Sequence, residues 1–227
     1  MLTVHHLENS RSQRVLWLLE ELELPYRVVH HARDPKTLLA PPALRAVHPL
    51  GKAPVLVDDN QALAESGAIL EYLVERYDTA HAVSPSPVPA MGTERLLYRY
   101  WMHYAEGSAM PPMLLALVLG RIRNAPMPFF ARPVARALVD RTMAAFVTPQ
   151  ARLHLDWMEQ ALDGGGWFAG ERFTAADIQM SFPIEAAAAR MDLRDRPNLR
   201  DFLARIHARP AYARALEQGG PFALAAG

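Results

Sequence analysis

Short apolar runs alternate with longer amphipathic segments at the start of the chain. Residues 2–7 and 26–30 are brief apolar runs, partly β-branched, of the kind that forms buried strands. Between them, apolar residues recur at helical spacing from Val15 to Leu22, and Leu24-Pro25 ends that pattern. The pattern predicts a strand, a helix and a second strand. No Gly-x-Gly-x-x-Gly follows the first strand, which argues against a dinucleotide site.

The next part of the chain predicts a hairpin and one more helix. Prolines break residues 34–47, which we expect to be irregular or partly helical. Two short apolar runs then flank Asp58-Asp59-Asn60, as in a β-hairpin. Glu65-Ser66 opens another amphipathic segment, which continues through Tyr77. These residues therefore predict an α+β unit in the order βαβ, irregular or α, ββ, α.

The periodicity changes after this unit. Residues 80–90 contain three prolines and two serines, which is typical of a linker between domains. Beyond them, apolar residues recur at helical spacing over residues 91–119, 130–162, 174–189 and 199–216. We therefore predict an α+β domain over residues 1–80, a linker over 81–90 and an all-helical domain over 91–227.

A capping signal marks the start of one of these helices. Thr174 is a favourable N-cap residue, and Asp177 follows three residues later, where its carboxylate can accept from the N-cap N–H. Phe173 and Ile178 can form a hydrophobic staple across the same turn. We expect a buried helix to begin here.

The first predicted helix also begins with polar residues that are candidates for a functional site. Ser10, Arg11 and Ser12 crowd its opening turn, immediately after the first strand. A helix N-terminus presents unpaired N–H groups and the positive end of the helix dipole, and it therefore favours an anion. The sequence predicts an anion site at this turn.

Composition excludes several classes of function. The chain has 227 residues, equal numbers of acidic and basic side chains, and no cysteine. Disulfides, thiolate metal sites and a protein-borne redox thiol are therefore excluded, and nothing in the charge favours nucleic acid or an anionic membrane. The longest apolar run, Met110 to Leu119, is too short to span a bilayer, and no secretory leader precedes the first strand. We expect a soluble, cytoplasmic protein.

Two histidine pairs, His5-His6 and His30-His31, suggest a metal site at first sight. Adjacent side chains on a strand point to opposite faces, so neither pair can chelate as a unit. No further ligand recurs at metal-site spacing. We predict core or edge histidines and no metal.

Four stretches together are similar to one known family. They are residues 10–14 (Ser-Arg-Ser-Gln-Arg), 51–56 (Gly-Lys-Ala-Pro-Val-Leu), 65–69 (Glu-Ser-Gly-Ala-Ile) and 173–177 (Phe-Thr-Ala-Ala-Asp). In this order and spacing the chain resembles the cytosolic glutathione transferases, in particular their serine-type fungal and bacterial branch. The resemblance implies a thioredoxin-like domain followed by an all-α domain, glutathione as co-substrate, no metal, and a homodimer.

The resemblance also implies a glutathione site in the first domain. Pro54 corresponds to a cis proline, which turns the backbone of Ala53 towards an extended peptide ligand; an ordinary trans proline is the alternative. Glu65 and Ser66 suit the ammonium and carboxylate of the γ-glutamyl group, or else form a capping pair without a ligand. Lys52 suits the glycyl carboxylate, or is a solvated loop charge.

The same resemblance assigns the chemistry to the opening turn. Ser10 falls where serine-type members keep the hydroxyl that donates to the glutathione thiolate, and Ser12 is predicted to cap the helix, although either serine remains a candidate. Arg11 either adds to the positive electrostatic potential at the sulfur or is a surface cation. No tyrosine precedes Tyr26 and the chain has no cysteine, so the tyrosine- and cysteine-type alternatives are excluded.

An electrophile site is expected beside the first helix of the second domain. Tyr100, His103, Tyr104 and Glu106 are its candidates, because the first three share one helical face. They are equally compatible with core or interface aromatics. Residues 120–130 form a lid or a plain interhelical loop.

The leading hypothesis is an enzyme that activates glutathione for attack on a small hydrophobic electrophile or a peroxide. The alternative is a non-catalytic binding or scaffold protein of the same fold.

Overall fold

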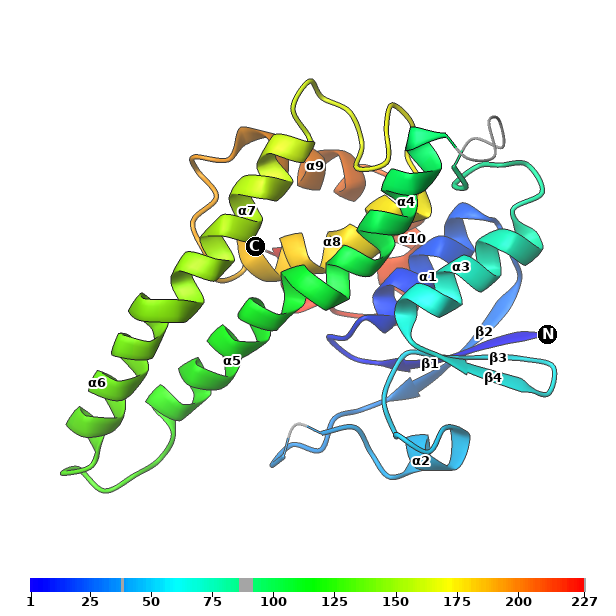
Figure 1. Cartoon of the computed structure of the whole chain (residues 1–227). Helices are drawn as coiled ribbons and strands as arrows, with labels where there is room; N and C mark the ends of the chain where they lie inside the picture. The colour runs from blue at the N-terminus through cyan, green and yellow to red at the C-terminus, as the bar shows by residue number, and fades with distance from the viewer. Residues whose placement is uncertain (38, 86–91, 227) are drawn as a thin grey trace.

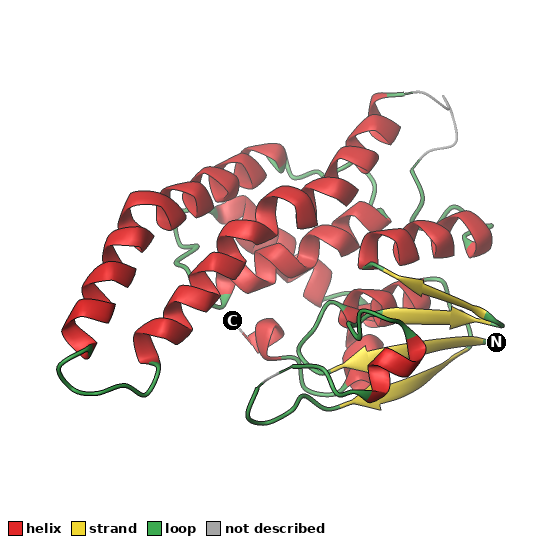
Figure 2. Ribbon diagram, turned by 60° about the horizontal axis from the view of Figure 1, so that its bottom comes forward, coloured by secondary structure: helices red, strands yellow, loops and turns green. Residues whose placement is uncertain are grey.

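The computed structural model describes residues 1–37, 39–85 and 92–226, and the predicted domain linker therefore lies partly outside the described residues. The predicted fold class is confirmed: an α+β unit is followed by helices only. Figures 1 and 2 show the sheet at one side of the molecule and the long helices extending from it.

A four-stranded mixed sheet with the order β2-β1-β3-β4 forms the first unit. β1 and β2 are parallel, whereas β3 is antiparallel to both β1 and β4. Helices α1 and α3 lie on one side of the sheet and α2 on the other (Figure 1). The bounds are β1 Leu2–Leu7, α1 Ser12–Glu21, β2 Tyr26–His31, α2 Ala43–Val47, β3 Val55–Asp58, β4 Gln61–Ala64 and α3 Ser66–Tyr77.

The second unit contains long helices that are continuous through π-helical turns. Each π turn precedes prolines, Pro111 and Pro112 in one helix and Pro149 in the other. A proline cannot donate an N–H to the preceding turn, which explains the wider turn just ahead of it. The bounds are α4 Thr93–Tyr104, π turn Ala105–Ala109, α5 Met110–Asn124, α6 Arg132–Thr142, π turn Met143–Val147, α7 Thr148–Ala161, α8 Ala175–Ala188, α9 Pro197–His207, α10 Pro210–Gly219 and the 3₁₀ turn Ala223–Ala226.

Two of the predicted helical segments differ from the structure. The segment predicted over residues 199–216 is two helices, because Pro210 begins α10 as a new helix. The segment predicted to end at residue 119 continues to Asn124, so the predicted excursion at 120–130 begins as the end of α5 and is an interhelical loop from residue 125 onwards.

Helix α8 is the centre of the core. Every residue from Ala175 to Ala187 is buried, and the helix packs against α1, α3, α4 and α9. The predicted capping box is confirmed, since the Thr174 N–H donates to the Asp177 carboxylate at 2.8 Å. The Phe168 N–H donates to the same carboxylate at 2.9 Å. Burial nevertheless raises the pKa of Asp177 to about 6.

The C-terminal helix α10 returns to the first unit and packs on α1. Trp17 of α1 meets the ring of Tyr212 edge-on, and Arg209 forms an ion pair with Glu21. Gly219 lies so close to α1 that a Cβ there would stand 2.6 Å from Oε1 of Gln13. Both ends of the described chain therefore contribute to one packed body. No helix within the described residues is long and apolar enough to span a membrane.

Candidate active site

The turn between β1 and α1 holds two serine hydroxyls 2.7 Å apart. The backbone N–H of Ser12 donates to Oγ of Ser10 at 3.2 Å, so Ser10 supplies an acceptor to the first residue of α1. The prediction that Ser12 caps this helix was wrong. The Ser12 hydroxyl turns back to the end of β1 instead, where the N–H of Leu7 donates to it at 3.2 Å and Nδ1 of His6 lies 2.9 Å away. Ser12 is fully buried, whereas Ser10 keeps 7% of its surface.

A carboxylate shared by two arginines joins α1 to the π turn after α4. Glu106 accepts from Nε of Arg11 at 2.7 Å and from Nη1 of Arg14 at 2.6 Å. Burial acts to raise the pKa of Glu106, but Arg14 and Arg11 outweigh it and hold that pKa below its usual range. Glu106 is therefore an anion at neutral pH and a poor general acid.

Arg14 is the member of this network that is hidden from solvent. Its side chain is 1% exposed, and burial lowers its pKa to about 10, so it remains a cation at neutral pH. Nη1 also donates to the hydroxyl of Ser66 at 3.2 Å, which ties α1 to the start of α3. The sequence pattern alone had indicated no role for Arg14. The available signal was a cation placed directly before the apolar residues of a buried helix.

A cavity of about 310 Å³ opens over these groups. It brings together most of the residues that the sequence singled out. Its lining is Arg11, His48, Leu50, Lys52, Ala53, Pro54, Ala64, Glu65, Ser66 and Glu106. The Ala53–Pro54 peptide is cis, as the resemblance implied.

Glu65 and Ser66 form the wall of this cavity at the N-terminus of α3. Glu65 has a φ of +70°, in the left-handed region that a residue with a side chain rarely adopts. Such strain costs on the order of 1–3 kcal/mol and concentrates at ligand sites. Ser66, by contrast, is buried and held by Arg14. The wall therefore presents the Glu65 carboxylate next to the Ser66 hydroxyl at a helix N-terminus that has no side-chain cap.

The sequence and fold of the chain match known proteins. Residues 4–81 match the family model of the glutathione S-transferase N-terminal domain, and residues 130–218 match that of the glutathione S-transferase C-terminal domain. The chain belongs to the glutathione S-transferase family.

Named relatives support this assignment over nearly the whole chain. Glutathione S-transferase 3 of Schizosaccharomyces pombe is 39% identical over 221 residues, which cover 96% of this chain and 88% of that protein. Glutathione S-transferase 1 of Saccharomyces cerevisiae is 31% identical, with 96% and 95% covered. A crystal structure of a glutathione S-transferase from Actinobacillus pleuropneumoniae has a TM-score of 0.82 at 34% identity, covering 98% and 94% of the two chains. The protein is accordingly an enzyme of this family.

The tyrosines predicted to line the transferase's electrophile site make contacts with α7. Tyr100 and Tyr104 do share a helical face and stack on each other, but this face meets α7. Nδ1 of His154 lies 2.6 Å from the Tyr104 hydroxyl, and the indole of Trp157 donates to Tyr100 at 3.1 Å. Of the four candidates, Glu106 alone lines the cavity, and His103 is exposed.

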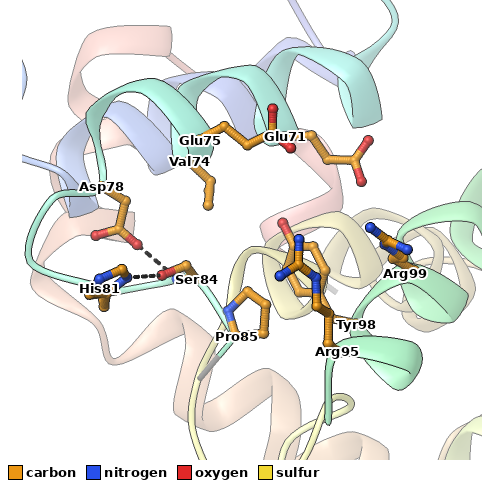
Figure 3. A pocket seen from close by; sticks show the side chains of 10 residues that line it. All are labelled: Glu71, Val74, Glu75, Asp78, His81, Ser84, Pro85, Arg95, Tyr98 and Arg99. Carbon is orange, nitrogen blue, oxygen red and sulfur yellow. Dashed lines mark hydrogen bonds between the residues drawn. The ribbon is translucent and has the colours of Figure 1, made fainter. Parts of the chain in front are cut away.

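A second cavity of the transferase, about 280 Å³, lies between α3 and α4 (Figure 3). Glu71 and Glu75 of α3 line it opposite Arg95 and Arg99 of α4. It shares no lining residue with the cavity at Pro54. Burial raises the pKa of its Tyr98 hydroxyl, which is therefore no acid or base near neutral pH. We assign no reaction to this cavity.

The histidine pairs belong to the sheet of the transferase. Nδ1 of His5 lies 3.1 Å from Nε2 of His31, and His6 meets His30 edge-on. Among the residues that the structure describes, no three histidine or acidic side chains gather as metal ligands would.

Proposed function

We propose that this transferase binds glutathione in the cavity at Pro54 and activates its thiol as a thiolate with the Ser10 hydroxyl. The thiolate then attacks a small hydrophobic electrophile or a peroxide. The observation that carries the proposal is that the two serine hydroxyls have different surroundings. The Ser12 hydroxyl is buried against β1, whereas Ser10 is 7% exposed and directly precedes Arg11, which lines the cavity.

The energy required is within reach of these groups. A thiol with a pKa near 8.5 is mostly ionised at pH 7 only if its pKa falls by about two units, which corresponds to about 2.7 kcal/mol. A hydroxyl that donates to a charged sulfur contributes about 1.5–3 kcal/mol, and the N-terminus of α1 adds about 0.3–1 kcal/mol. No metal and no general base are required.

The remaining cavity residues suit the rest of the glutathione molecule. Ser66 and the first N–H groups of α3 fit the γ-glutamyl carboxylate, and Glu65 fits its ammonium. The Ala53 backbone next to the cis Pro54 fits an extended peptide. Lys52 fits the glycyl carboxylate.

The test is a comparison of two hydroxyl deletions. Ser10→Ala should raise the pKa of bound glutathione, measured from thiolate absorbance, by about one to two units, and should lower turnover of a chlorodinitrobenzene-type substrate about tenfold or more at pH 7. Ser84→Ala removes a hydroxyl from the other cavity and should change neither quantity. Equal thiol pKa values in Ser10→Ala and the parent would remove Ser10 from the reaction. Absence of glutathione binding by calorimetry would overturn the whole proposal.

We also propose that the transferase is a homodimer. Large apolar side chains stand exposed on adjoining helices: Leu96 and Tyr100 on α4, and Leu153 and Trp157 on α7. Sets of this kind usually mark an interaction surface. Leu96→Glu should shift the sedimentation coefficient to that of a monomer, and a parent that already sediments as a monomer would contradict the proposal.

A further inference from the structure

A chain of hydrogen-bonding groups leads from Ser10 away from the cavity to a buried histidine. Oγ of Ser10 lies 2.7 Å from Oγ of Ser12, which in turn lies 2.9 Å from Nδ1 of His6 on β1. Ser12 and His6 are 0% and 3% exposed. Each link is thus short and closed to bulk water.

A hydroxyl has a single proton, which limits how this chain can be arranged. Ser10 already accepts the Ser12 N–H at 3.2 Å. If Ser10 is to donate its proton to a sulfur in the cavity, the 2.7 Å contact requires that Ser12 donates to Ser10. Ser12 then has no proton left for His6. The 2.9 Å contact is therefore a hydrogen bond only if Nδ1 of His6 carries a proton.

The other tautomer of His6 reverses every link. With Nδ1 bare, Ser12 donates to His6, and Ser10 donates to Ser12. The Ser10 proton then points away from the cavity. A neutral imidazole has only one N–H, and the Leu7 carbonyl, 3.2 Å from Oγ of Ser12, is a further acceptor for the Ser12 proton. A proton on Nδ1 of His6 therefore leaves Ser12 free to donate to Ser10, whereas a bare Nδ1 draws the Ser12 proton away from Ser10.

The surroundings of His6 keep the ring neutral, so that both tautomers are open to it. Burial and the neighbouring His30 lower the pKa of His6 to about 4; Glu8 and the backbone carbonyl of Gly219 act in the opposite direction, and His31 lowers it slightly. The Gly219 carbonyl offers the ring proton a second acceptor. The ring therefore holds one proton at neutral pH, with competing sites for it.

We propose that His6, acting through Ser12, is a positioning residue that aims the Ser10 hydroxyl at the glutathione sulfur. In the thiolate complex, Nδ1–H of His6 donates to Ser12, Ser12 donates to Ser10, and Ser10 donates to the sulfur. No net proton is transferred along the chain, and the thiol proton leaves to solvent. This inference rests on the proposed role of Ser10.

The first test observes the tautomer in the unaltered protein. ¹⁵N-histidine NMR with glutathione bound above the pKa of its thiol should show His6 protonated at Nδ1. S-methylglutathione, which has no thiolate, should leave His6 in its ligand-free state. A His6 signal that is the same in both complexes would overturn the inference. The response should also vanish in Ser10→Ala, and a response that persists there would show that it does not run through Ser10.

Variants provide the functional test. His6→Phe should raise the pKa of bound glutathione by about half a unit or more, since Ser12 loses the donor that polarises it, and should lower kcat with an unchanged KM for glutathione. His6→Asn, which keeps an N–H near the position of Nδ1, should restore both values. His5→Phe is the matched control, because His5 is on the same strand but pairs with His31. An unchanged thiol pKa in a folded His6→Phe would refute the relay.

A double variant separates failure of the relay from failure of the proposed function. His6 acts only through Ser10, so Ser10→Ala combined with His6→Phe should match Ser10→Ala alone. Additive effects would assign His6 a separate role. If Ser10→Ala itself leaves the thiol pKa unchanged, the role of Ser10 fails and the relay fails with it. If Ser10→Ala raises the pKa but His6→Phe does not, only the relay fails.

Discussion

Replacing Glu106 with glutamine removes the carboxylate that Arg11 and Arg14 share. The change keeps the shape of the side chain but leaves the Arg14 cation, 1% exposed, without its counter-charge. Nε and Nη2 of Arg14 already have no hydrogen-bond partner, so the guanidinium would keep only the neutral Ser66 hydroxyl as acceptor. Breaking a buried ion pair from one side costs about 3–5 kcal/mol. Because the Glu106 side chain is 32% exposed, we expect the lower end, about 3 kcal/mol.

Urea denaturation followed by tryptophan fluorescence measures this loss. The midpoint should fall with an unchanged slope, since the exposed area on unfolding is the same. Arg11→Ala is the matched control: its side chain is 34% exposed, so solvent screens its pair with Glu106 and the loss should stay below about 1 kcal/mol.

The double variant Arg14→Met with Glu106→Gln tests the reasoning directly. It leaves no stranded charge, so it should lose about 2 kcal/mol less than the sum of the two single variants. If the two losses add to within about 0.5 kcal/mol, Arg14 and Glu106 do not act as a unit, and a stranded cation does not explain the loss in Glu106→Gln.

Two further outcomes follow from buried ionisable groups. Asp177→Ala should destabilise the protein by about 3 kcal/mol and lower its Tm by about 6–12 °C in differential scanning calorimetry, because the N–H groups of Phe168 and Thr174 lose their acceptor; a Tm within 2 °C of the parent would contradict this. The folded-state pKa of His6, about 4, lies below its unfolded value of 6.5, so the unfolded chain binds more protons between these values and stability falls as the pH drops through that window. The loss attributable to His6 is about 2 kcal/mol at pH 5 relative to pH 8. The raised pKa of Asp177 makes stability rise as the pH falls, which is the opposite effect. This contribution is the same in the parent and in His6→Phe, so it cancels in their difference. The difference in urea-unfolding free energy between the parent and His6→Phe should therefore change by that amount between the two pH values, and a constant difference would refute the assignment.

The sheet and the residues of the cavity could be predicted from local sequence patterns. Strands, hairpin and helices of the first unit are set by periods of two and of 3.6 residues, which are properties of neighbouring residues. Pro54, Glu65 and Ser66 were found because each belongs to a short motif, and the structure brings them together at one cavity.

Local pattern could not predict the contacts that depend on tertiary packing. The Ser12 hydroxyl could bond either to its own helix or to the end of β1. Only the packing of α1 on the sheet determines which of these partners it meets. Tyr100 and Tyr104 share the predicted face, but which neighbour that face meets depends on α7, about fifty residues later. Arg14 was missed because its partners, Ser66 and Glu106, are remote in sequence.

The π turn at Ala105–Ala109 determines how the continuous helix from α4 to α5 would respond to the loss of one residue. A π turn accommodates one more residue than an α turn, and this turn contains Glu106. Deleting one residue from it would let α4 and α5 join as a regular helix. Because the wider turn absorbs the additional residue, the buried face of α5 around Met113 would still meet the core after the deletion. The additional residue therefore alters the chain only at the turn, where Glu106 meets the two arginines, and leaves the rotational phase of α5 unchanged.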